Sequence, residues 1–183
     1  MPIKKQLSLW HTRYCSRGFT LLEVLVALIV MSVGLLSLAG MQVIGLRTNH
    51  SAYMRTQATI QSYDIIDRMR ANIAGVKGGR YDKPTVADSA GVQHTACKTT
   101  SGCSVQQMAE HDLFEWNQAI ADVLPNGVGL VCVDNTPEDG TPGTPTCSGP
   151  AFAKPEMEMY AIKIWWTDDQ SATPQLFATS FRP

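Results

Sequence analysis

The order of apolar and polar positions divides the chain into a uniformly apolar stretch, an amphipathic stretch and a mixed remainder. Residues 24–46 carry no charged side chain, and only Ser32, Ser37 and Gln42 interrupt the apolar run with polar groups. A helix of this length rises about 35 Å, enough to cross a hydrocarbon core of about 30 Å. The pattern predicts a membrane-spanning helix. The alternative, a buried helix of a soluble protein, would need a larger core than 183 residues build.

After Leu46 the apolar positions recur at helical spacing, with no proline between them. The predicted buried stripe consists of Met54, Ala58, Ile65, Met69 and Ile73, with Ser62 filling its gap and Ile66 beside it. Gly75 and the pair Gly78-Gly79 are expected to end this element. We therefore expect one helix from Phe19 to Ala74, whose second half packs on the rest of the chain.

The remainder, residues 76–183, is called the head and predicts one further helix and several strands. Ser104 and Gln107 form a capping-box signature, and apolar residues follow at helical spacing, namely Leu113, Trp116, Ile120 and Leu124. Strands are predicted at 128–133, 157–166 and 175–182, with a breaker-rich loop at 136–150 and a turn at 168–170. In the second strand, Tyr160, Ile162, Ile164 and Trp166 share one face. We expect an α+β fold with a long N-terminal hydrophobic helix packed on a small antiparallel sheet, plus one additional helix.

Charge is distributed unevenly along the chain. Residues 1–18 contain four basic and no acidic side chains, whereas residues 81–183 contain five basic and 13 acidic ones. Nucleic-acid binding is disfavoured, because it needs a concentrated basic surface. The basic leader predicts that the N-terminus stays in the cytoplasm and that residues 47–183 are exported.

Five cysteines are present, and four of them, Cys97, Cys103, Cys132 and Cys147, lie in the head. An even set in an exported segment predicts two disulfides. Three connectivities are open, and proximity favours Cys97–Cys103 and Cys132–Cys147. A zinc site that combines these thiols with His94 or His111 is the rival, although no C-x-x-C pair occurs.

Catalytic signatures are poor in this sequence. It contains no glycine-rich phosphate loop after a strand, no G-x-S-x-G and no H-E-x-x-H. His111 lies in a predicted helix rich in acids and is expected to be solvated. Trp165 and Trp166 alternate on a strand, so one is expected in the core and the other at the surface. We expect no enzyme activity, no cofactor and no metal.

The residues before the apolar stretch, Arg17-Gly18-Phe19-Thr20-Leu21-Leu22-Glu23, carry the most specific signal. The apolar stretch is longer than that of a secretory signal peptide, although the triplet Ser37-Leu38-Ala39 leaves cleavage before Gly40 open. Glu23 lies where the bilayer begins, and an intramembrane carboxylate indicates a functional site with a partner. It is alternatively a helix-start acid that favours the macrodipole. Cleavage between Gly18 and Phe19 would create an α-amino group four residues from this carboxylate, in the same chain or in a neighbour.

The segment RGFTLLEVLVALIVMSVGLLSLAGMQ resembles the class III signal of type IV pilins and pseudopilins. The resemblance implies cleavage after Gly18 by prepilin peptidase, N-methylation of Phe19 and a role for Glu23 in assembly. The stretch DLFEWNQAIADVLPNGVGLVCV resembles PilV-type minor pilins. Where major pilins commonly place a proline, this chain has Gly40, so no fixed kink is expected there.

The resemblance implies a domain order and a set of partners. We expect a prepilin leader at 1–18, a transmembrane and filament-core helix at 19–46, an amphipathic continuation at 47–75 and the head at 76–183. The implied function is that of a minor pilin, which primes pilus assembly and supports twitching motility and attachment. It would reside first in the inner membrane and then in the pilus. Its partners would be other minor pilins, the major pilin, a pilus tip adhesin, the peptidase and the inner-membrane assembly platform. The alternatives are a pseudopilin of a type II secretion system and a membrane-anchored periplasmic binding module.

Overall fold

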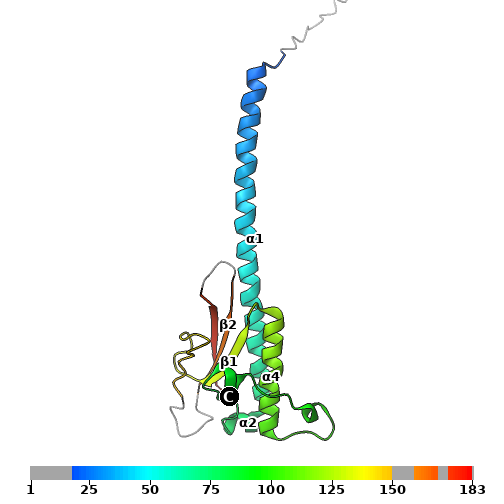
Figure 1. Cartoon of the computed structure of the whole chain (residues 1–183), viewed down its shortest axis with the longest axis vertical. Helices are drawn as coiled ribbons and strands as arrows, with labels where there is room; N and C mark the ends of the chain where they lie inside the picture. Colours follow the sequence, from blue (N-terminus) through cyan, green and yellow to red (C-terminus); the bar gives the residue numbers. More distant parts are fainter. Residues whose placement is uncertain (1–17, 150–158, 169–172, 183) are drawn as a thin grey trace, which may run out of the picture. The chain divides into compact units, whose positions relative to one another are not determined.

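The computed structural model describes residues 18–149, 159–168 and 173–182 (Figure 1). The chain forms two compact units, one ending at Leu46 and the other beginning at Arg47. Helix α1 (Leu21–Ala71) contributes residues to both. The expected helix from Phe19 to Ala74 is therefore wrong at both ends: residues 18–20 precede the helix, and Asn72 interrupts it.

In the first unit, Thr20 determines where α1 begins. Its hydroxyl oxygen accepts a hydrogen bond from the backbone N–H of Glu23 at 3.2 Å, which satisfies one of the free donors of the first helical turn. The helix continues through Gly40 without a break. The hydroxyls of Ser32 and Ser37 donate to the carbonyls of Ile29 and Val33, so these polar groups are satisfied within the helix.

The second unit combines helices with one sheet. The helices after α1 are α2 (Ile73–Lys77), α3 (Val86–Ser89), the 3-10 helix η1 (Thr95–Lys98) and α4 (Val105–Val123). The strands are β1 (Val128–Val133), β2 (Tyr160–Trp166) and β3 (Gln175–Phe181). They form an antiparallel sheet in the order β1-β2-β3, with Val131 opposite Ile162 and Ile162 opposite Thr179. The predicted α+β class is confirmed.

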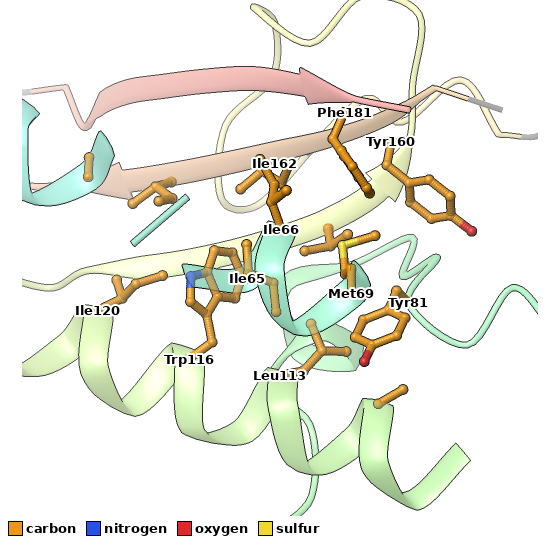
Figure 2. Close-up of a cluster of buried hydrophobic side chains, with 14 of the residues drawn as sticks. Ile65, Ile66, Met69, Tyr81, Leu113, Trp116, Ile120, Tyr160, Ile162 and Phe181 are labelled. Atoms are coloured by element: carbon orange, nitrogen blue, oxygen red, sulfur yellow. The ribbon is translucent and has the colours of Figure 1, made fainter. Parts of the chain in front are cut away.

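One core joins α1, α4 and the sheet. Figure 2 shows Ile65, Ile66 and Met69 of α1 between the side chains of α4 and those of the strands. Trp116 is fully buried there, and its indole N–H donates to the carbonyl of Gln61 at 2.8 Å, which joins α4 to α1. Burying a side chain of this size contributes about 2–3 kcal/mol, and the hydrogen bond removes the cost of its polar atom.

Most of the predicted pattern in this unit is confirmed. The stripe residues Met54, Ala58, Ser62, Ile65 and Met69 are buried, as are Leu113, Trp116 and Ile120 of α4 and Leu124 directly after it. The capping box of Ser104 and Gln107 is formed in both directions. The expected burial of Ile73 is wrong, because the chain turns at Asn72 and leaves this side chain 41% exposed. Residues 157, 158, 169 and 170 of the predicted second strand and turn lie outside the described residues, as does Pro150 of the loop.

The second face of the sheet is buried as well. Leu130, Cys132 and Trp165 form a smaller cluster there, and Cys147 packs against it. Trp165 and Trp166 are both buried, at 1% and 2% exposure. The expectation that one of them lies at the surface is wrong, because the disulfide-closed loop after β1 covers the face that the alternation assigned to solvent.

Candidate assembly site

Gly18 and Phe19 lie before the first turn of α1, in backbone without regular structure. A Cβ added at Gly18 would meet nothing within 4 Å. Phe19 is 81% exposed. Among the described residues, no helical hydrogen bond involves the peptide bond between them and no side chain shields it, so an enzyme can reach it in an extended conformation.

Glu23 lies in the first turn of α1, one turn after Phe19. The two residues line the same shallow hollow, of about 380 Å³, together with Val24, Ala27, Leu28 and Met31. Because both residues line this hollow, a charge created at Phe19 would lie near the Glu23 carboxylate, and the other lining residues are apolar.

Residues 18–46 are exposed along the whole first unit. Among the described residues, α1 is the one helix long and apolar enough to cross a membrane, and it meets this criterion by length and composition. Such an apolar surface requires lipid or other helices as its surroundings.

Comparison with known families bears directly on this segment. A family profile for the prokaryotic N-terminal methylation motif matches residues 13–39. A second profile, described as type IV pilin Tt1218, matches residues 40–114.

The chain is a type IV pilin-like prepilin.

This membership accounts for the α+β fold and supports a pilin role, anchored by the apolar helix before incorporation into a pilus. Type IV pilins are a structural family. A search of curated proteins and a search of solved structures each found no significant match.

The prepilin carries a T-x-x-E sequence whose value the sequence analysis missed. Thr20 and Glu23 have the spacing of a capping box, and the structure uses Thr20 to start α1. This cap keeps Gly18 and Phe19 outside the helix. The T-x-x-E spacing directly before an apolar run was the signal that could have found it.

In the second unit the structure forms both disulfides that proximity favoured. Cys97 pairs with Cys103, and Cys132 pairs with Cys147. Among the described residues, no group of three or more histidine, cysteine or acidic side chains is placed to hold a metal ion. The thiols are thus used to close loops, and the larger of the two loops follows β1.

Ion pairs connect three elements of the second unit. The Arg68 guanidinium of α1 donates to Asp64 at 2.8 Å and to Glu115 of α4 at 2.9 Å. Lys98 of η1 pairs with the same Glu115. The hydrogen bonds from Lys98 and Arg68 lower the pKa of Glu115 to about 2. This cluster was not predictable from the sequence, because Arg68, Lys98 and Glu115 lie far apart in the chain.

A buried polar group lies beside this cluster. The Tyr81 hydroxyl donates to Asp112 at 2.5 Å and accepts from the Asn72 amide at 3.2 Å. Burial raises the pKa of both Tyr81 and Asp112. Arg68 lies 3.6 Å from Asp112, so positive charge offsets part of that burial cost.

The two histidines of the zinc alternative connect the segment before α4 to that helix. His94 pairs with Glu110 at 2.7 Å, and its backbone N–H donates to Nδ1 of His111 at 3.2 Å. The expectation that His111 is solvated is wrong, since His111 is only 3% exposed. The segment before α4 packs over it, which acidic neighbours in the sequence did not reveal.

Lys163 of β2 is the second charged residue whose burial was not foreseen. It is fully buried, and its ammonium lies 2.7 Å from Asp134 and 2.9 Å from Asp139. It also donates to the carbonyl of Pro145 at 2.8 Å. These contacts attach the loop closed by Cys132 and Cys147 to the face of the sheet opposite α1.

Proposed function

We propose that this chain is a minor pilin of a type IV pilus, most like the PilV type. Before assembly it spans the inner membrane with its N-terminus in the cytoplasm and its head in the periplasm. The observation that carries the proposal is the arrangement at the start of α1. An accessible Gly18–Phe19 bond lies outside the helix, Glu23 lies one turn inside it, and an apolar segment of bilayer length follows.

Prepilin peptidase cuts after Gly18, and Phe19 becomes the N-methylated terminus. Phe19 and Glu23 line the same hollow, so the new ammonium group and the Glu23 carboxylate can pair within a chain or between neighbouring chains. An unpaired charge in an apolar surrounding costs several kcal/mol, and this cost disfavours any register that separates the two groups. Assembly therefore selects the packing in which every Glu23 meets a terminus.

The partners follow from this role. In the membrane they are the peptidase and the assembly platform; in the fibre they are other minor pilins, the major pilin and a tip adhesin. The minor pilin primes fibre growth and so supports twitching motility and attachment. Neither cleavage nor packing requires a cofactor from this chain.

The test is the N-terminus of the protein isolated from its own membranes. Mass spectrometry should find N-methyl-phenylalanine at residue 19 in the wild type. Gly18→Leu should retain the leader, because a bulky side chain directly before the bond hinders its binding by the peptidase. Within this chain the substitution meets no obstacle, since a Cβ at Gly18 has nothing within 4 Å. Gly40→Ala is the matched control, since a Cβ at that glycine also meets nothing within 4 Å, and it should leave the terminus unchanged. A mature protein that begins at Gly40, or that keeps its leader, would replace the pilin role by that of a membrane-anchored binding module. Recovery in a secretion fibre rather than a pilus would identify a type II pseudopilin.

A further inference from the structure

The two edges of the sheet differ in how they are protected. The outer edge of β1 is bonded at three alternate residues. The N–H of Gly129 donates to the Asn117 side chain at 2.8 Å, and the carbonyl of Val131 accepts from Lys83 at 2.9 Å. At Val133 both backbone groups are bonded: its N–H donates to the Asp82 carboxylate, and its carbonyl accepts from the N–H of Gly149.

These bonds fix the direction of every backbone group in the sheet. In an antiparallel ladder both polar groups of a residue point to the same side, and the side alternates along the strand. Because Val131 faces away from β2, its opposite residue Ile162 must bond to β3, and there it meets Thr179. By the same reasoning, Ile164 and Tyr160 bond to Phe177 and Phe181 of β3. The backbone N–H and C=O groups of the residues between them therefore point away from the sheet, namely those of Leu176, Ala178 and Ser180.

Within the part of the chain that the structure describes, the outward backbone groups of β3 have no hydrogen-bond partner. Among the described residues, no backbone or side-chain hydrogen bond reaches these three residues from outside the ladder with β2. Figure 1 shows β3, in dark red, at the edge of the sheet. Its sequence from Gln175 to Phe181 contains no proline and no charged residue, the two devices that usually protect an edge strand.

A hollow of about 400 Å³ follows this edge and is lined by Leu176, Phe177 and Ala178. Arg55 of α1 borders it on the core side of the sheet. Glu138 borders it from the loop that Lys163 holds on the opposite side. Among the described residues neither charge has an ion-pair partner, although both lie within reach of a strand added at the edge.

We propose that the β3 edge binds an extended strand of another protein by main-chain pairing. The strand carries an acidic residue facing Arg55 and, next to it in sequence, a basic residue facing Glu138. Successive side chains of a strand point to opposite faces, so adjacent residues of opposite charge satisfy both flanks at once. A second copy of this chain fits less well, because its own β3 brings no charge to either flank. This inference goes beyond the proposed pilin role and depends on the second unit alone.

The test uses the full chain in detergent micelles and a capped synthetic peptide, Thr-Val-Glu-Lys-Val-Thr. Amide hydrogen exchange is followed by NMR. The peptide should slow exchange at Leu176, Ala178 and Ser180 by about tenfold or more. Phe177 and Thr179, whose amides already pair with β2, should change little. A peptide in which glutamines replace the two charged residues should bind less tightly.

Ala178→Pro removes an outward N–H without removing a bond to β2, and it should weaken peptide binding about tenfold. Ala178→Val is the matched control and should retain binding. If the proline variant does not fold, a peptide with N-methyl groups on the amides that face β3 gives the same test on the wild type, and it should not bind. Absent protection of the three amides, equal binding by the proline variant, or binding of the N-methylated peptide would overturn the proposal. Equal affinity of the uncharged peptide, or dimerisation through β3 without peptide, would overturn the partner chemistry assigned to it.

Discussion

At the scale of single residues, Glu115 connects three elements of the second unit. It receives Arg68 from α1 and Lys98 from η1, while its own backbone belongs to α4. Its side chain is 26% exposed, and that of Lys98 is 60% exposed, so water screens part of the attraction. The main role of the cluster is to hold η1 and its disulfide against α4, and its contribution to the free energy of unfolding is small.

The pH dependence of unfolding should reveal this carboxylate. Its folded-state pKa of about 2 lies below the ordinary glutamate value of 4.5, so its ionised form stabilises the fold above pH 4.5 and the stabilisation is lost as the pH falls toward 2. Glu115→Gln should lower the free energy of unfolding by about 1 kcal/mol at neutral pH, less than full linkage because of the exposure. The difference from wild type should shrink below pH 4.5.

Denaturant unfolding followed by tryptophan fluorescence between neutral and acidic pH measures this difference. Asp122→Asn is the control, since that side chain is exposed and forms no ion pair among the described residues. A difference between Glu115→Gln and wild type that stays constant across the acid range would show that the carboxylate's charge does not stabilise the fold.

The burial of charged and titratable residues was the property least predictable from the sequence. Gly18, Phe19 and Glu23 could be proposed as site residues because their signal lies within one short segment. Lys163 and His111 could not, since each is buried by a segment distant in sequence whose path no local pattern fixes. A charged residue in a strand is expected to be exposed to solvent unless buried partners for its charge are known.

At the scale of elements, Asn72 separates α1 from α2 although the helical pattern continues through it. Its side chain accepts from the N–H of Gly75 at 3.2 Å and so caps α2. Its amide also donates to the carbonyl of Val105 at 2.9 Å, at the start of α4. This one side chain therefore ends one helix, begins another and attaches both to a third.

Asn72→Ala should lower the free energy of unfolding by about 2 kcal/mol, because it removes a helix cap and leaves the Val105 carbonyl without its donor. Chemical denaturation of the full chain in detergent measures the change. Asn135→Ala, at an exposed loop position, should stay within about 0.5 kcal/mol of wild type. An equal effect of the two substitutions would show that the hydrogen bonds of the Asn72 side chain do not stabilise the fold.

Elements with a complete local signal were predictable. The capping box of Ser104 begins α4, and the spacing of Leu113, Trp116 and Ile120 identifies its buried side. The break at Asn72 was missed, because an apolar residue at position 73 continues the stripe and the competing bonds come from distant partners. Register was not predictable either, since it depends on which edge of the sheet the rest of the chain covers.

At the scale of the whole molecule, the two units differ in the surroundings they require. The second unit buries its apolar residues in its own core, whereas residues 18–46 bury none and depend on lipid or neighbouring helices. A single charged side chain, Glu23, lies in this first unit among the described residues. Under the proposed role, its partner is the new terminus of this chain or of a neighbouring chain, and assembly depends on this one residue.

Glu23→Ala should therefore leave cleavage after Gly18 intact and reduce incorporation into the fibre about tenfold, because the ammonium of Phe19 loses its counter-charge in an apolar surrounding. The mature terminus is read by mass spectrometry, and the assembled fraction by immunoblotting of sheared fibres against membranes. Gln42→Ala, in the same apolar segment, is the matched control and should assemble normally. Glu23→Asp keeps the charge and should assemble better than Glu23→Ala. Normal incorporation of Glu23→Ala would remove the carboxylate from the assembly mechanism, whereas loss of cleavage in that variant would place Glu23 in recognition by the peptidase.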